Sequence, residues 1–346
     1  MKKFGLVLIC LFGMIGMVNA VRVADLYQGR VPVASQSQEE RNQVLQQGLG
    51  QVLVKVSGNT QVLNNPKVQS HLSGANSLVQ EFSYSASHQP NETKPYLLQL
   101  DFDVDSVNAI LSDAGVPIWG QHRPLILIWL EDEAPGHPAE MINAESTQTI
   151  SSVLKQNAYR RGIPVIFPAM DIQDLSQIAI NDIVTMDITK LTNAAKRYGS
   201  DAILIGRIVQ DANGYNTQWK FILSQDQWGW NVTGKSLPDV LAALTDHVAD
   251  ALAGRYATVV TDNVQAKVMI KVTGITLEDD FTRLMSYLKH LTTVADVEVV
   301  RVANDAVILR VSVRGNQTSF MQSILSEKKL TPEPEDNQML VYQWNH

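Results

Sequence analysis

Cysteine is nearly absent from this chain: the single cysteine among the 346 residues is Cys10. A mature part that begins after it cannot form disulfides, so its stability has to come from hydrophobic cores. Histidine is also scarce, and no two of the seven histidines share metal-ligand spacing on one expected helix or strand. We therefore expect neither a zinc site nor a cofactor.

Familiar catalytic signatures are missing as well. The sequence contains no nucleophile elbow G-x-S-x-G, no phosphate loop G-x-x-x-x-G-K-[ST] and no dinucleotide fingerprint G-x-G-x-x-G. Beyond the N-terminus there is no run of about 18 apolar residues, so we expect no second membrane span. These absences favour a binding protein over an enzyme.

The first twenty residues have the composition of a secretory signal peptide. Lys2 and Lys3 form a charged start, residues 5–18 form an apolar core, and Val-Asn-Ala at 18–20 fits the small-residue cleavage rule. Cys10 lies inside the apolar core instead of at its end, which argues against a lipoprotein. We expect cleavage after residue 20 and a periplasmic protein of a Gram-negative bacterium; the alternatives are an uncleaved anchor and release outside the cell.

The charge balance is acidic. The 28 Lys and Arg residues face 35 Asp and Glu residues, a formal net charge of −7, and loss of the two lysines of the signal would give −9. An acidic balance argues against nucleic acid as a partner. Cleavage would leave 326 residues (346 − 20), a length that allows two or three domains.

Hydrophobic periodicity predicts three modules of the α+β or α/β class. Residues 21–115 predict antiparallel strands packed on one long helix, which begins at a capping box, S-Q-E-E at 37–40. Residues 122–255 predict a mixed sheet flanked by helices, and the apolar run R-P-L-I-L-I-W-L at 123–130 predicts its central strand, buried on both faces. Residues 264–346 predict a ferredoxin-like β-α-β-β-α-β order.

Finer boundaries follow from the same patterns. Residues 95–104 alternate as a strand, and residues 236–252 form a helix that Gly254 should end. Residues 331–337 carry two prolines and predict a loop before a last strand at 338–344. The expected linkers are residues 114–121 and 256–263.

Three aspartates would share one face of the strand at 95–104, because side chains alternate along a strand. Asp101, Asp103 and Asp105 could then hold a calcium ion. The EF-hand pattern fails, however, at its glycine and glutamate positions. A solvated strand face is the preferred interpretation.

Aromatic residues gather at the expected antiparallel edge of the central sheet. Tyr215, Trp219, Trp228 and Trp230 could anchor a protein partner, or they could belong to the core beneath the helix that follows. Trp228 and Trp230 share one strand face, so the core would account for one face at most. We interpret these four as possible partner-binding residues.

Charged residues follow the central strand. Glu131, Asp132 and His137 lie where ligands often bind, beyond a strand end of an open sheet, and could form an acid/base pair. A solvated loop is the preferred interpretation. The third module is locally basic, with acidic residues in between, which we interpret as an ordinary surface; the basic residues are Lys271, Arg283, Lys289, Arg301, Arg310 and Arg314.

Two long motifs resemble a known family. Residues 35–59, S-Q-S-Q-E-E-R-N-Q-V-L-Q-Q-G-L-G-Q-V-L-V-K-V-S-G-N, resemble the opening of an uncharacterised exported bacterial family, domain of unknown function 2066. The resemblance continues through residues 123–130 and through Y-G-S-D-A-I-L-I-G-R-I at 198–208. It implies an uncharacterised family and assigns no activity.

The central module also resembles a wider group of envelope domains. The group includes the N-terminal domain of the translocation protein TolB, the curli secretion subunit, activators of penicillin-binding proteins and a flagellar ring protein. The shared pattern ends in G-x-D-A-hydrophobic-hydrophobic-x-G, here residues 199–206. The resemblance implies binding to envelope partners without chemistry.

Together these patterns predict a non-enzymatic periplasmic adaptor, an accessory subunit of a secretion, flagellar or cell-wall assembly. Its expected partners are envelope proteins, and it could form oligomers. One alternative is a cell-wall hydrolase that uses Glu131, Asp132 or His137. The other is a carrier of a small ligand or lipid, which would require a sizeable apolar cavity.

Overall fold

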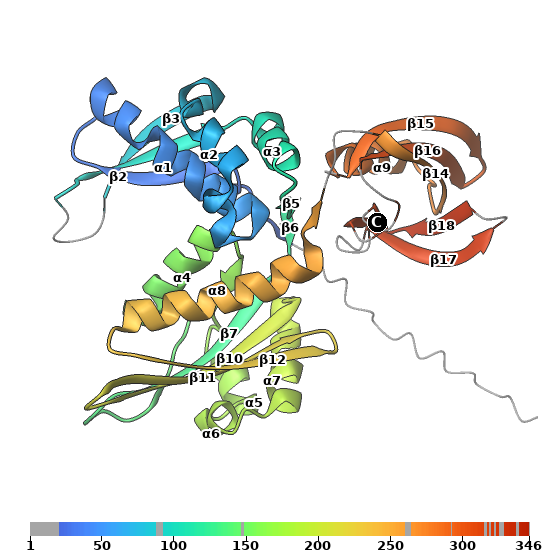
Figure 1. Ribbon diagram of the computed structural model, residues 1–346. Coiled ribbons are helices and arrows are strands. Elements are labelled where there is room, and N and C mark those ends of the chain that lie inside the picture. Colours follow the sequence, from blue (N-terminus) through green and yellow to red (C-terminus); the bar gives the residue numbers. More distant parts are fainter. Residues whose placement is uncertain are drawn as a thin grey trace, which may run out of the picture.

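The computed structural model describes residues 21–87, 93–146, 149–259, 264–291, 293–314, 317, 320–321, 323–324, 329–336 and 339–345. The expected signal peptide lies outside the described residues. Helices and strands are mixed along the whole chain, which confirms the α+β or α/β class. Figure 1 shows three bodies, each built around its own sheet. No helix in the described ranges is long and apolar enough to cross a membrane.

The first body is a three-stranded antiparallel sheet packed on α1 (Gln38–Ser57). Its order is β2-β4-β3, with β2 (Gln28–Val33), β3 (Val79–Ala86) and β4 (Tyr96–Phe102). Ser37 is the N-cap of α1, and its Oγ accepts a hydrogen bond from the Glu40 N–H at 3.2 Å. The Glu40 carboxylate binds the N–H groups of Ala34 and Ser35, so the reciprocal half of the predicted capping box is wrong.

A helix follows β4 where the sequence predicted more strand. Helix α3 (Val104–Asp113) starts two residues after Phe102, and Asp103 is its N-cap, with Oδ1 2.8 Å from the Ser106 nitrogen. Asp103 and Asp105 therefore do not share a strand face with Asp101, and the three-carboxylate site is wrong. Among the described residues, no three His, Asp or Glu side chains lie close enough to hold a metal ion.

The remaining pieces of this body are short. They are η1 (Thr60–Asn64), α2 (Pro66–Leu72), η2 (Ala75–Leu78), β1 (Val21–Arg22), β5 (Pro117–Ile118) and β6 (His122–Arg123). Strand β1 pairs with β6, and β5 pairs with β13 (Thr258–Val259), which follows the central body. Both expected linkers thus contain a short strand.

Strand β7 (Ile126–Glu133) is the centre of the second sheet, as predicted. Residues 126, 128 and 130 face one core and residues 127 and 129 face another, so both faces are buried. The parallel neighbours are β9 (Val165–Ile166) and β10 (Ala202–Asp211). The sheet turns antiparallel through β11 (Gly214–Leu223) and β12 (Asp226–Gly234), and β8 (Glu140–Met141) adds a strand that the sequence did not predict.

Helices cover both faces of this sheet. One core includes residues of α4 (Thr149–Arg161) and α8 (Leu237–Tyr256). The other includes residues of α6 (Ile180–Val184) and α7 (Ile188–Ala195) and contacts η3 (Lys196–Tyr198), and α5 (Ile172–Gln177) packs beside α7. Helix α8 runs past Gly254, so the predicted end at that residue is wrong. A single glycine costs a helix only about 1 kcal/mol, which the long apolar face of α8 offsets.

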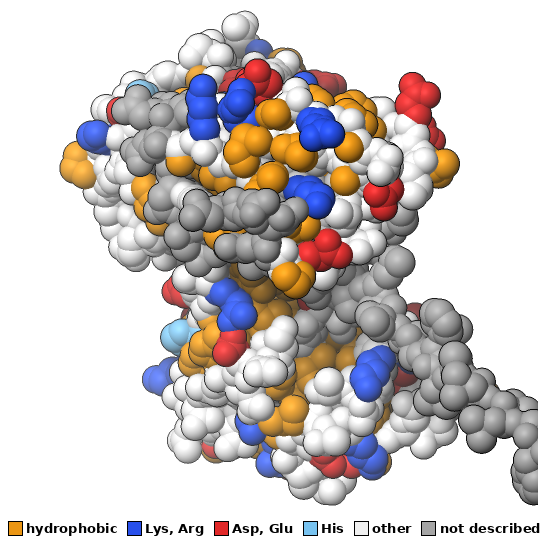
Figure 2. All heavy atoms as spheres, turned by 90° about the vertical axis from the view of Figure 1, so that its right-hand side faces the viewer, with side chains coloured by type: hydrophobic (Ala, Val, Ile, Leu, Met, Phe, Trp, Pro, Cys, Tyr) orange, Lys and Arg blue, Asp and Glu red, His pale blue; other side chains and the backbone are white. Residues whose placement is uncertain are grey.

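The third body is a five-stranded sheet with the order β15-β16-β14-β18-β17. Its elements are β14 (Val264–Thr273), α9 (Glu278–His290), β15 (Val294–Ala303), β16 (Ala306–Arg314), β17 (Leu330–Asp336) and β18 (Met339–Trp344). Phe320 and Ile324, in the segment predicted as a second helix, are buried in its core. Hydrophobic and basic side chains share the surface of this body, the upper one in Figure 2.

The closing part of this body differs from the ferredoxin-like prediction. The proline-containing segment predicted as a loop is strand β17, so β18 runs parallel to β14 instead of antiparallel. Proline is tolerated there because β17 is an edge strand, where a missing N–H can face solvent.

Three buried cations join the first two bodies. Lys55, Arg123 and Arg161 are each at most 1% exposed. Arg123 donates hydrogen bonds of 2.7–3.1 Å to five backbone carbonyls, those of residues 55, 119, 120, 161 and 162. Arg161 binds Asp246 and Asp250 on α8. Because these bonds connect α1, β6, α4 and α8, they hold the first body against the central one.

Candidate functional site

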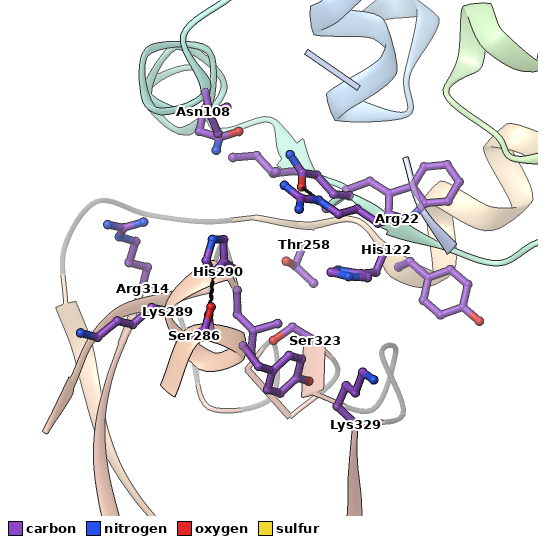
Figure 3. A pocket seen from close by; sticks show the side chains of 18 of the residues that line it. Arg22, Asn108, His122, Thr258, Ser286, Lys289, His290, Arg314, Ser323 and Lys329 are labelled. Carbon is purple, nitrogen blue, oxygen red and sulfur yellow. Dashed lines mark hydrogen bonds between the residues drawn. The ribbon is translucent and has the colours of Figure 1, made fainter. Parts of the chain in front are cut away.

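A cleft of about 840 Å³ lies between the C-terminal body and the other two bodies. One wall carries side chains of β1, β6, α3 and β13. The other carries side chains of α9 and of the chain around β16, β17 and β18 (Figure 3). Its volume falls in the range of roughly 300–1,000 Å³ that is common for ligand-binding sites.

Positive charge dominates this cleft. The Lys and Arg residues that line it are Arg22, Arg283, Lys289, Arg314 and Lys329. Asp105 is the one acidic side chain among the described lining residues. Within the part of the chain that the structure describes, none of the five cations forms an ion pair, although Arg22 Nε donates to the Gln121 side chain at 2.9 Å. No described acidic side chain therefore neutralises these five charges.

Basic side chains project from both walls. Figure 3 shows Arg22 and His122 on one side and Lys289, His290 and Arg314 on the other. His290 is held by its own helix, with Nδ1 2.5 Å from the Ser286 carbonyl oxygen. A ligand between the walls would meet positive charge on both sides.

Aromatic residues line the same cleft. They are Tyr27, Trp119, Tyr256, Tyr287 and Trp344. Tyr27 donates a hydrogen bond to Asn108 Oδ1 at 2.9 Å, and burial raises the pKa of Tyr27 to about 12, so its hydroxyl stays protonated. The cleft therefore combines cations with aromatic surface, which suits a ligand that carries both anionic and apolar groups.

The sequence did not point to this cleft. Three of the basic residues interpreted as an ordinary surface, Arg283, Lys289 and Arg314, belong to it. One wall could have been recognised in part from α9, because Arg283, Ser286 and His290 recur at helical spacing opposite its apolar stripe. Apart from the chain around β13, the other wall comes from residues 22–122, more than 150 residues before α9, so no local pattern connects the two.

The aromatic group of the central sheet lies against α8. Trp219 is 2% exposed and belongs to the core, so its side chain is not available to a partner. Trp228 lies beside Phe221, with ring centroids 5.4 Å apart, and Trp230 stacks on His247 of α8 at 5.7 Å. Tyr215, Trp228 and Trp230 are half-buried, and a partner-binding role for them stays a prediction.

Glu131 and Asp132 lie within β7 and not after it as predicted, and with His137 they do not form one site. Glu131 is buried against Arg207, whose Nε lies 3.2 Å from a carboxylate oxygen, and burial raises the pKa of Glu131. Asp132, the next strand residue, points to the opposite face, and burial raises its pKa as well. His137 is exposed in the loop that follows. None of the three lines the cleft.

Comparisons with known proteins give limited matches. Residues 20–120 match a family described as a domain of unknown function, DUF8605. An uncharacterised family is thereby confirmed for this part, but it is DUF8605 and not domain of unknown function 2066. No curated protein matches the chain.

One solved structure with partial similarity is TolB from Acinetobacter baumannii. The similarity has 12% sequence identity and a TM-score of 0.24, and it covers 44% of this chain and 32% of the TolB chain. The matched part is thus about a third of TolB. At this level it does not establish a shared fold.

Proposed function

We propose that this chain is a non-enzymatic binding protein of the cell envelope, an accessory subunit that holds an acidic segment of a partner protein in the cationic cleft. The observation that carries the proposal is the gathering of five cations without ion-pair partners among the described residues, in a chain whose net charge is −7. The composition of the N-terminal residues supports export to the periplasm.

Electrostatics favour an anionic occupant. Like charges on the two walls repel each other across the cleft, and an anion between them is attracted by both. The remainder of the surface is acidic on balance and repels the same ligand, so the field directs it to the cleft.

The lining favours a polypeptide over an inorganic anion. Half-buried aromatic side chains such as Tyr256 and Tyr287 line the cleft together with the cations, and they gain most from a ligand with apolar groups. An acidic segment with interspersed aliphatic or aromatic residues has this composition.

Binding can be tested with residues 21–346 and a fluorescent copolymer of glutamate and tyrosine, measured by anisotropy. We expect binding that weakens with salt, and a rise in Kd of about tenfold or more for Lys289→Glu with Arg314→Glu. The control, Lys196→Glu with Lys235→Glu, makes the same charge change at exposed positions outside the cleft. An equal loss in the control, or equal affinity for inorganic polyphosphate, would contradict the proposal.

Binding to an envelope partner in the cell requires a separate measurement. A photoreactive residue at position 286, in the cleft, should cross-link the full chain to a defined envelope protein, and the charge reversals at 289 and 314 should abolish that product. The same label at exposed Thr331 is the control. Retention of the chain in the cytosolic fraction after osmotic shock would overturn the periplasmic part.

A further inference from the structure

Strand β15 forms an open edge of the C-terminal sheet. Among the described strands, only β16 pairs with it. Three of its valines are exposed, Val299 at 40%, Val300 at 44% and Val302 at 62%. The strand has ten residues, longer than the usual five or six. A long, valine-rich edge with open hydrogen-bonding groups favours pairing with another strand.

The charges on this edge are self-complementary. Glu298 lies opposite Arg310 of β16 and forms an exposed ion pair with it at 2.8 Å, and Arg301 lies opposite Ile308, so Glu298 and Arg301 share one face of β15. The irregularity between Val299 and Arg301 makes this possible, because one extra residue shifts the alternation. In an antiparallel pair of such strands, the acid of each copy can face the base of the other copy.

From this arrangement we propose that two copies of the chain pair antiparallel through β15. The two-fold axis passes between Val299 and Val300, which places Glu298 of each copy opposite Arg301 of the other. The exposed valines are covered in the joined sheet. Such an interface is isologous, so it closes at a dimer. None of its residues lines the cationic cleft, so the dimer and the proposed ligand binding are independent.

Charge reversal gives a sharp test with residues 21–346 and analytical ultracentrifugation. Glu298→Arg places two bases opposite two bases, and Arg301→Glu places two acids opposite two acids. Each variant alone should self-associate at least about tenfold more weakly than the unmodified chain. An equimolar mixture should regain dimers, because the proposed register pairs each reversed charge with its opposite. This recovery also shows that both variants are folded.

A second pair of variants separates β15 from the other sheet edge. Val302→Lys introduces a charge on β15 and should weaken the dimer, whereas Thr331→Lys on the opposite edge strand β17 should leave it unchanged. A monomer at the highest soluble concentration, a mixture that fails to restore dimers, or a dimer broken by Thr331→Lys alone would each overturn the proposal.

Discussion

The ammonium nitrogen of Lys55 lies 3.4 Å from the centroid of the Tyr159 ring, a cation–π contact between α1 of the first body and α4 of the central one. The same nitrogen donates to the Gln28 carbonyl at 2.9 Å, and the Tyr159 hydroxyl donates to that carbonyl at 3.1 Å. Burial lowers the pKa of Lys55 to about 7, an effect that the nearby Asp25 partly opposes. The junction therefore contains a group that titrates near neutral pH.

Lys55 should make the stability of the junction depend on pH. Its pKa is about 7 in the folded chain and near 10.5 when unfolded, so the unfolded chain binds more protons between these values. The free energy of unfolding should therefore rise as pH increases from about 7 towards 10. Urea midpoints across this range should show the rise, and Lys55→Met should flatten it. Exposed Lys196→Met is the control, and an unchanged slope in Lys55→Met would refute this assignment.

Gly206 should tolerate no side chain. A Cβ at this position would lie 1.9 Å from Cζ3 of Trp219 on the paired strand β11, and the ring is held in the core. We expect Gly206→Ala to lower the free energy of unfolding by about 2–3 kcal/mol. In contrast, exposed Gly254 of α8 has nothing within 4 Å, so Gly254→Ala should raise it by about 0.5–1 kcal/mol. Thermal denaturation of both variants gives the comparison, and a neutral Gly206→Ala would contradict the packing argument.

The guanidinium geometry of Arg123, and not only its charge, should contribute to the stability of the junction. A lysine at 123 keeps one positive charge but cannot reach five carbonyls at once, which leaves several buried acceptors without donors. We expect Arg123→Lys to cost about 2–4 kcal/mol in chemical denaturation. Exposed Arg22→Lys should cost less than about 1 kcal/mol. Hydrogen exchange should rise at the junction in the Arg123 variant, and equal effects of the two changes would contradict this role.

Glu131 should give the opposite pH trend to Lys55. Its folded pKa is raised by burial, so the folded chain holds the proton more tightly and loses stability as pH rises above the unfolded value. The neutral Glu131→Gln variant lacks this loss, and its stability relative to the unmodified chain should increase from acidic to neutral pH. Exposed Glu39→Gln is the control. A difference that stays constant with pH would show that Arg207 fully compensates the buried charge.

Local patterns predicted the elements in which neighbouring residues all indicate the same secondary structure. Residues 126–130 form a run without polar interruption, and only a strand with cover on both faces can bury it. The helix at α1 was equally clear, because Ser37 and Gly58 mark its ends and the apolar positions recur between them.

Elements and sites that depend on residues distant in the chain could not be predicted from the sequence. Asp103 looks like one position in an alternating strand, but it caps α3 because the chain turns there to pack on the first body. The prolines of β17 indicate a loop unless the strand is known to lie at an edge. The cleft is the extreme case, since Arg22 and Arg314 face it from opposite ends of the chain.

The fit between Gly206 and Trp219 changes the meaning of the sequence pattern that ends at this glycine. The residue is small because an indole occupies the adjacent space, so the signature reports the internal shape of one sheet. Unrelated chains with that shape would carry the same letters whatever they bind. A role assigned through this signature alone therefore rests on architecture and not on a binding surface.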